Sequence, residues 1–178
     1  DGILSSEEQE EVVQGIVRPT IQGMKAEGTP FKGVLYVGLM LTPDGIKVLE
    51  YNVRLGDPEA QPVLFRLENN LVEVLQAIQT QTLDLVELRW DSACSVCVVL
   101  ASGGYPGKYP SGKPIQGVAE AEAVGKVKVF HAGTRLNDGE LVTAGGRVLG
   151  VTAKDRDLYS AIARVYRALK RVRFEDMH

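Results

Sequence analysis

The sequence predicts an α+β protein, and three observations carry that prediction. Residues 5–28 and 158–171 place apolar side chains at helical spacing. Residues 34–41 and 46–55 are β-rich apolar runs on either side of the turn TPDG, a hairpin pattern with Pro and Gly where a type I turn favours them. Residues 93–101 are β-branched and apolar on both faces, which is typical of a buried strand.

The composition is that of an ordinary globular protein, with 178 residues, 44% hydrophobic and 24% charged. This length allows one domain or two small ones. A net charge of −3 gives no electrostatic basis for binding nucleic acid or an anionic membrane, and no apolar run is long enough to span a bilayer. Two cysteines are too few for a disulfide framework, so we expect a cytoplasmic protein.

The first helix is expected to begin after Ser5, because Ser5-Ser6 is followed by acidic and amide residues that complete a helix cap. Its apolar residues recur up to Gly28, which we expect to end it. Pro19 falls inside the pattern and should kink or divide the helix. We expect only packing from this segment.

The second strand of the hairpin carries a row of polar side chains. Alternate residues of a strand share a face, so Glu50, Asn52 and Arg54 should project together, with Tyr51, Val53 and Leu55 in the core. A carboxylate, an amide carbonyl and a guanidinium in one row suit a hard cation and the phosphates that it bridges. The same alternation is also typical of a solvated sheet face.

The row continues without a break into Gly56-Asp57-Pro58-Glu59, which a solvated face does not require. Asp57 is a good helix cap and Pro58 a good first helical residue. Helix starts of this kind collect anions, because their unpaired N–H groups point at the ligand. We therefore expect the functional site between residues 50 and 59.

A helical pattern runs from Pro58 to Ile78, and the polar residues 68–70 are expected to break it in two. The pattern loosens from residue 79 onward. We place a domain boundary near residue 90, which gives domains 1–90 and 91–178.

The second half is expected to contain the buried strand, a long loop at residues 103–117, three further strands and the last helix. The strands are 127–134, 140–143 and 147–153. Cys94 and Cys97 face opposite sides of a strand, so they are interpreted as core cysteines and not as metal ligands. His131 is interpreted as structural, and the segment GYPG at residues 104–107 either encloses an active site or simply connects two elements.

Residues 50–61, EYNVRLGDPEAQ, closely resemble the signature of the phosphoribosylamine–glycine ligase (glycinamide ribonucleotide synthetase) family, within the ATP-grasp superfamily. Further segments resemble that family in the same order, and the likeness runs nearly from end to end. They are residues 27–33 (EGTPFKG), 103–107 (GGYPG), 129–134 (VFHAGT) and 145–153 (GGRVLGVTA).

The resemblance implies the carboxyl-terminal half of an ATP-grasp domain over residues 1–90 and a small mixed α/β domain with a mainly antiparallel sheet over residues 91–178. The chain would then be the carboxyl-terminal part of a longer enzyme, inactive alone, whose upstream part grips ATP. The family joins glycine to 5-phosphoribosylamine through a glycyl phosphate, with ATP as co-substrate, in purine biosynthesis.

The resemblance also implies residue roles. Glu50 and Asn52 would hold Mg²⁺ or Mn²⁺ by oxygen, and Arg54 would meet the transferred phosphoryl group or the substrate carboxylate. Asp57 and Glu59, on a loop shaped by Gly56 and Pro58, would contact and orient the amine-bearing substrate and accept its proton. The strand at residues 34–41 contains no acid, so the chain offers one strong metal position where many relatives have a second.

Two alternatives stay open from the sequence. One is another ATP-grasp carboxylate–amine ligase, such as a biotin-carboxylase-like enzyme, against which the residues after Arg54 argue. The other is a folded, non-catalytic module, because no Gly-rich phosphate loop or ATP-gripping lysine of the family lies in these residues.

Overall fold

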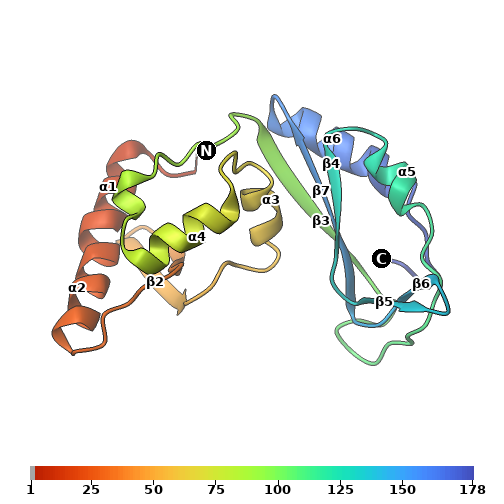
Figure 1. Ribbon diagram of the computed structural model, residues 1–178, viewed down its shortest axis with the longest axis horizontal. Coiled ribbons are helices and arrows are strands. Elements are labelled where there is room, and N and C mark those ends of the chain that lie inside the picture. The colour runs from red at the N-terminus through yellow and green to blue at the C-terminus, as the bar shows by residue number, and fades with distance from the viewer. Residues whose placement is uncertain (1–2) are drawn as a thin grey trace. The chain divides into compact units, whose positions relative to one another are not determined.

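The computed structural model describes residues 3–178. They form two compact units, one made of residues up to 56 with 72–86, the other of residues 57–71 with 87–178. The helices are α1 Ser6–Val12, η1 Val13–Val17, α2 Arg18–Ala26, α3 Ala60–Leu64, α4 Leu71–Thr80, η2 Leu83–Leu85, α5 Val118–Glu122 and α6 Leu158–Leu169 (Figure 1). The strands are β1 Tyr36–Thr42, β2 Gly45–Asn52, β3 Cys94–Ala101, β4 Val127–His131, β5 Thr134–Asn137, β6 Glu140–Thr143 and β7 Arg147–Asp155.

The first helical segment confirms the expected cap and the expected division. The Ser5 hydroxyl accepts a hydrogen bond from Glu8 N, and the Glu8 carboxylate accepts one from Ser5 N. The π-helical turn η1 separates α1 from α2 and ends two residues before Pro19, which lacks the N–H donor of the helical ladder. Gly28 follows the last turn with a φ of +79°, a conformation that glycine adopts without strain.

The predicted hairpin is present, with β1 and β2 antiparallel and Thr42 paired with Gly45 across the turn. The register shifts between Gly38 and Leu39. Gly38 pairs with Glu50, and a Cβ on Gly38 would lie 3.1 Å from Glu50 Cγ. The glycine therefore leaves room on β1 for the Glu50 side chain.

The predicted break after α3 is also confirmed, and it shows why residues 57–71 belong to the second unit. The Asn69 side chain donates to Glu87 O (3.0 Å) and accepts from Arg89 N (2.6 Å). Asp91 N donates to Arg66 O (2.8 Å), so the segment after α3 is tied to residues 87–91 by main-chain bonds. Side-chain and backbone groups of the polar break are thus used for this contact.

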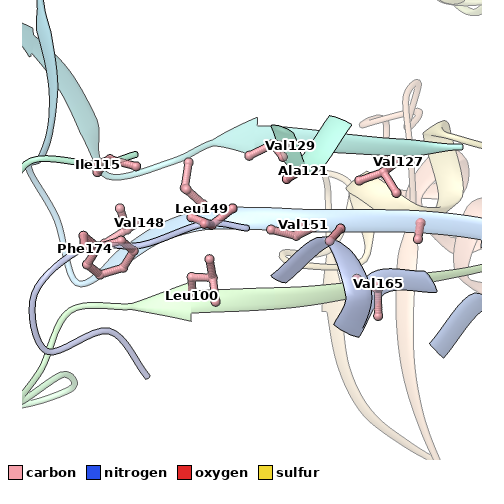
Figure 2. Packing of buried hydrophobic residues seen from close by; sticks show 13 residues of the cluster. Leu100, Ile115, Ala121, Val127, Val129, Val148, Leu149, Val151, Val165 and Phe174 are labelled. Carbon is pink, nitrogen blue, oxygen red and sulfur yellow. The ribbon is translucent and has the colours of Figure 1, made fainter. Parts of the chain in front are cut away.

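The second unit is built on a three-stranded antiparallel sheet in the order β3-β7-β4. The α5 and α6 helices pack on it, and α3 contacts β3 and β7 (Figure 1). Figure 2 shows Leu149 and Val151 of the central strand between Leu100 of β3 and Val129 of β4. The apolar run predicted to be a buried strand is therefore an edge strand of this sheet, covered by helices.

Two details of the second unit differ from the sequence prediction. The expected strand 127–134 is two strands, β4 and β5, because Ala132 and Gly133 turn the chain between them. β5 then pairs with β6 through a turn at residues 138–139. The apolar face of α6 was expected to carry Leu158, Ile162, Val165, Tyr166 and Leu169. Its buried residues are Ala161, Val165 and Ala168, whereas Leu158 and Tyr166 are more than half exposed. Small side chains let the helix approach the sheet closely, so the alanines and not the largest apolar residues mark its buried face.

The fold class predicted from the sequence, α+β with mainly antiparallel sheets, is confirmed. The division near residue 90 stays a prediction about the domains. Among residues 3–178 no helix has both the length and the apolar character needed to cross a membrane.

Acidification is expected to destabilise the second unit through Asp155. Its carboxylate accepts hydrogen bonds from Arg156 N (2.8 Å) and from Arg164 (2.6 Å), and these hold the pKa of Asp155 below its ordinary value of 3.8. Because the pKa is lower in the folded state, this stabilisation is complete above the unfolded-state pKa and is lost as the pH falls through the folded-state pKa. Thermal melting of Asp155→Asn between about pH 7 and about pH 3 should show a smaller acid-induced drop than wild type.

The matched control is Asp138→Asn, a change at the tip of the β5–β6 turn, which should keep the wild-type pH dependence. If the Asp155→Asn protein lost as much stability in acid as wild type, the contacts of Asp155 with Arg156 N and Arg164 would not be the source of the acid sensitivity.

Candidate functional site

Glu50 and Asn52 lie on one face of β2 in the first unit, as predicted. Asn52 Nδ2 donates to Glu50 Oε1 at 2.9 Å, which orients both side chains. The bond uses one Glu50 oxygen and the amide nitrogen, so Glu50 Oε2 and Asn52 Oδ1 can serve as ligands. A carboxylate and an amide oxygen fit Mg²⁺ or Mn²⁺, hard cations that complete their shell with phosphate oxygens and water.

Arg54 is not part of the row that the sequence predicted. β2 ends at Asn52, and Arg54 lies in the connection that follows, where its Nη1 donates to Leu55 O at 3.0 Å. The alternation of faces ends with the strand, since it depends on the pleated backbone. The guanidinium is exposed and keeps most of its donors for a ligand.

The side chains expected in a core opposite the polar row are more exposed than predicted. Tyr51 is 45% exposed and Val53 is 72% exposed. The Tyr51 hydroxyl lies 3.0 Å from Thr20 Oγ1 of α2. These residues line an apolar cavity of about 170 Å³ in the first unit, together with Ile21, Met24, Phe31 and Leu35.

Asp57 does not cap a helix, contrary to the sequence prediction. α3 begins only at Ala60, with Glu59 as the preceding residue and no side-chain cap, and residues 57–59 form a turn in which the peptide bond before Pro58 is cis. Asp57 belongs to the second unit, where its Oδ2 accepts a hydrogen bond from Arg147 Nη2 at 2.8 Å. Tertiary packing therefore gives this carboxylate a cationic partner instead of a helix end.

The two cysteines are free thiols, but both are only half-buried, so they do not lie in the core as the sequence predicted. Burial raises the pKa of the Cys97 thiol, and the charge of Asp57 adds to the increase, which disfavours the nucleophilic thiolate. Within residues 3–178 no group of three or more His, Cys, Asp or Glu side chains is placed to hold a metal. The Glu50–Asn52 pair stays the metal position predicted from the sequence.

Two family models match the chain. The model of the phosphoribosylglycinamide synthetase ATP-grasp (A) domain matches residues 2–60, and that of the phosphoribosylglycinamide synthetase C domain matches residues 95–178. The chain belongs to the phosphoribosylglycinamide synthetase family. The resemblance seen in the sequence is confirmed, and the segment with Glu50, Asn52, Arg54 and Asp57 lies inside the first match.

Two curated relatives are named phosphoribosylamine–glycine ligase. The one from Rhodopirellula baltica is 48% identical over 97% of this chain and 40% of its own length. The one from Synechocystis is 52% identical over 95% of this chain and 41% of its own length. The chain thus spans about two fifths of their length. A crystal structure of phosphoribosylamine–glycine ligase from Thermotoga maritima matches with a TM-score of 0.86 and 29% identity, over 99% of this chain and 43% of that one. N5-carboxyaminoimidazole ribonucleotide synthetase from the same organism, at 18% identity and a TM-score of 0.64, shares the fold.

Arg147 is the contact of Asp57 that sequence reasoning missed. It lies in the segment GGRVLGVTA, residues 145–153. This segment resembles the family, but the sequence assigned no role to any of its residues. The available signal was the pair Gly145-Gly146 directly before an arginine, since paired glycines mark places where the backbone must pack closely.

Proposed function

We propose that this chain forms part of an ATP-dependent ligase that joins glycine to 5-phosphoribosylamine, giving glycinamide ribonucleotide, ADP and phosphate in purine biosynthesis. The names of its relatives support this activity. The single observation that carries it is the orientation of Glu50 and Asn52 by one hydrogen bond, on a strand inside the ATP-grasp match.

Glu50 and Asn52 are proposed as the ligands of Mg²⁺ or Mn²⁺, through Glu50 Oε2 and Asn52 Oδ1. A cation held there would supply the charge neutralisation that phosphoryl transfer from ATP requires. The carboxylate of glycine attacks the γ-phosphorus and ADP leaves, giving glycyl phosphate. The amine of phosphoribosylamine then attacks the carbonyl carbon, phosphate leaves, and the amine proton goes to a base.

Arg54 is proposed to bind the transferred phosphoryl group or the glycine carboxylate, because its planar fork of donors matches either anion. Asp57 and Glu59 are proposed to contact and orient the amine, with Asp57 as the proton acceptor. Gly56 and Pro58 are proposed to shape the substrate-binding turn. Gly56 is buried, whereas Asp57 and Glu59 are exposed to ligands.

The domains proposed for this chain are an ATP-grasp part over residues 1–90 and the family C domain over residues 91–178. Its proposed partners are the three small substrates and the rest of the same enzyme, with no nucleic acid or membrane. The free thiols support a reducing compartment, and we propose the cytoplasm.

The proposal is tested with the full-length protein and with residues 1–178 alone. We expect the full-length protein to form ADP and glycinamide ribonucleotide only when ATP, glycine, phosphoribosylamine and Mg²⁺ are all present. The isolated chain should show no glycine-dependent ATP hydrolysis, because the ATP-gripping lysine and phosphate loop expected of the family are absent from its sequence. Turnover by the isolated chain would contradict this prediction, and turnover of the full-length protein with another carboxylate in place of glycine would favour a different ATP-grasp ligase.

A further inference from the structure

Arg147 and Asp57 are 90 positions apart in the sequence and meet in the second unit. Arg147 Nη2 donates to Asp57 Oδ2 at 2.8 Å, and Arg147 Nη1 reaches the main-chain carbonyl of Asp57 at 3.4 Å. One guanidinium therefore holds both the side chain and the backbone of the first residue of the turn. The contact engages Oδ2 and leaves Oδ1 for a second donor.

The main chain that carries Arg147 is itself fixed. Gly133 N donates to Arg147 O (2.8 Å), and Ser102 N donates to Gly146 O (2.8 Å). A Cβ on Gly146 would clash with the ring of Tyr105 in the loop after β3. The guanidinium thus projects from a backbone that is closely packed against two other segments.

The support that Asp57 receives comes from Arg147, and no side-chain hydrogen bond caps the helix α3 that follows the turn. The Asp57 and Arg147 side chains are 57% and 40% exposed. An ion pair of that exposure contributes little to stability, because water and salt screen it. Its effect is on where the carboxylate points.

We propose that Arg147 is a positioning residue that fixes the Asp57 carboxylate with Oδ1 directed to the amine substrate. This inference rests on the proposed function, in which Asp57 contacts that amine. The two-pronged donor is required, because a lysine ammonium is a point charge that cannot hold a carboxylate and a carbonyl in one plane.

A double-mutant cycle in the full-length enzyme tests the proposal with the variants Arg147→Met, Asp57→Asn and their combination. We expect Arg147→Met to lower kcat at least about tenfold in the wild-type background and by less than about twofold in the Asp57→Asn background. Arg147→Lys should restore only a small part of the loss. The melting temperature should stay unchanged in all variants, whereas a merely structural role would lower it.

The matched control is Arg156→Met, which removes another exposed arginine–aspartate pair of the second unit, Arg156 with Asp157 at 3.1 Å. It should leave kcat unchanged. Losses from Arg147→Met and Asp57→Asn that multiply would overturn the proposal, because Arg147 would then act independently of Asp57.

Crystal structures of the full-length wild type and of Arg147→Met separate this inference from the proposed function. The pair should be present in the wild type, and in the variant the Asp57 carboxylate should move while β7 stays in place. If the wild type lacks ligase activity, the proposed function fails and these structures still decide whether Arg147 holds Asp57. A wild-type structure without the contact, or a carboxylate that does not move, overturns the inference.

Discussion

Replacing Glu50 with Gln in the full-length enzyme is expected to abolish turnover that depends on a divalent cation. The amide keeps the size of the side chain and can still accept the hydrogen bond from Asn52, so β2 should fold normally. It removes the negative charge that is proposed to hold the cation, and a metal ligand of this kind is worth several kcal/mol of transition-state stabilisation, at least about a thousandfold in rate. Steady-state kinetics over a range of Mg²⁺ concentrations measures the loss.

Asp44→Asn is the matched control, because it removes an exposed acid from the turn of the same hairpin. Asp44 lies eight positions before Asn52, the last residue of β2. It should leave the metal dependence unchanged. If Glu50→Gln retained activity and metal affinity within about threefold of wild type, less than about 1 kcal/mol, the metal role of Glu50 would be wrong.

The second large effect is expected from Asp57→Asn, which should lower turnover at least about a hundredfold, the low end for loss of a general base. The melting temperature should barely change, because Asp57 caps no helix and its ion pair with Arg147 is exposed. Asp57→Glu should fail as well, since the extra methylene displaces the carboxylate from the position in which Arg147 holds its Oδ2. Kinetics and thermal melting on the same sample measure both quantities.

Asp157 offers a control in which aspartate does cap a helix. Its side chain accepts a hydrogen bond from Ser160 N at the start of α6, and Asn can accept the same bond. Asp157→Asn should therefore leave turnover at the wild-type level. Near-normal turnover of Asp57→Asn would remove Asp57 from the reaction, and with it the reason to assign Glu59 to the amine.

The sequence by itself determined the family, the fold class and the local elements. Residues 50–61 carry a signature in consecutive positions, and the hairpin, the Ser5 cap and the break at residues 68–70 follow from turn, capping and periodicity rules that act over a few residues. The proximity of Glu50 and Asn52 was predictable for the same reason, because residues two positions apart on a strand share a face.

Only the tertiary structure decided where the strand ends, which side of α6 is buried, and what Asp57 contacts. Arg54 lies beyond β2, Ala161 and Ala168 form the buried side of α6, and residues 57–71 join the second unit. The Arg147–Asp57 contact joins positions 90 residues apart, and no local pattern encodes it. Such outcomes depend on which side chains meet after packing, since close approach of backbones and exclusion of water are properties of the assembled core and not of any single segment.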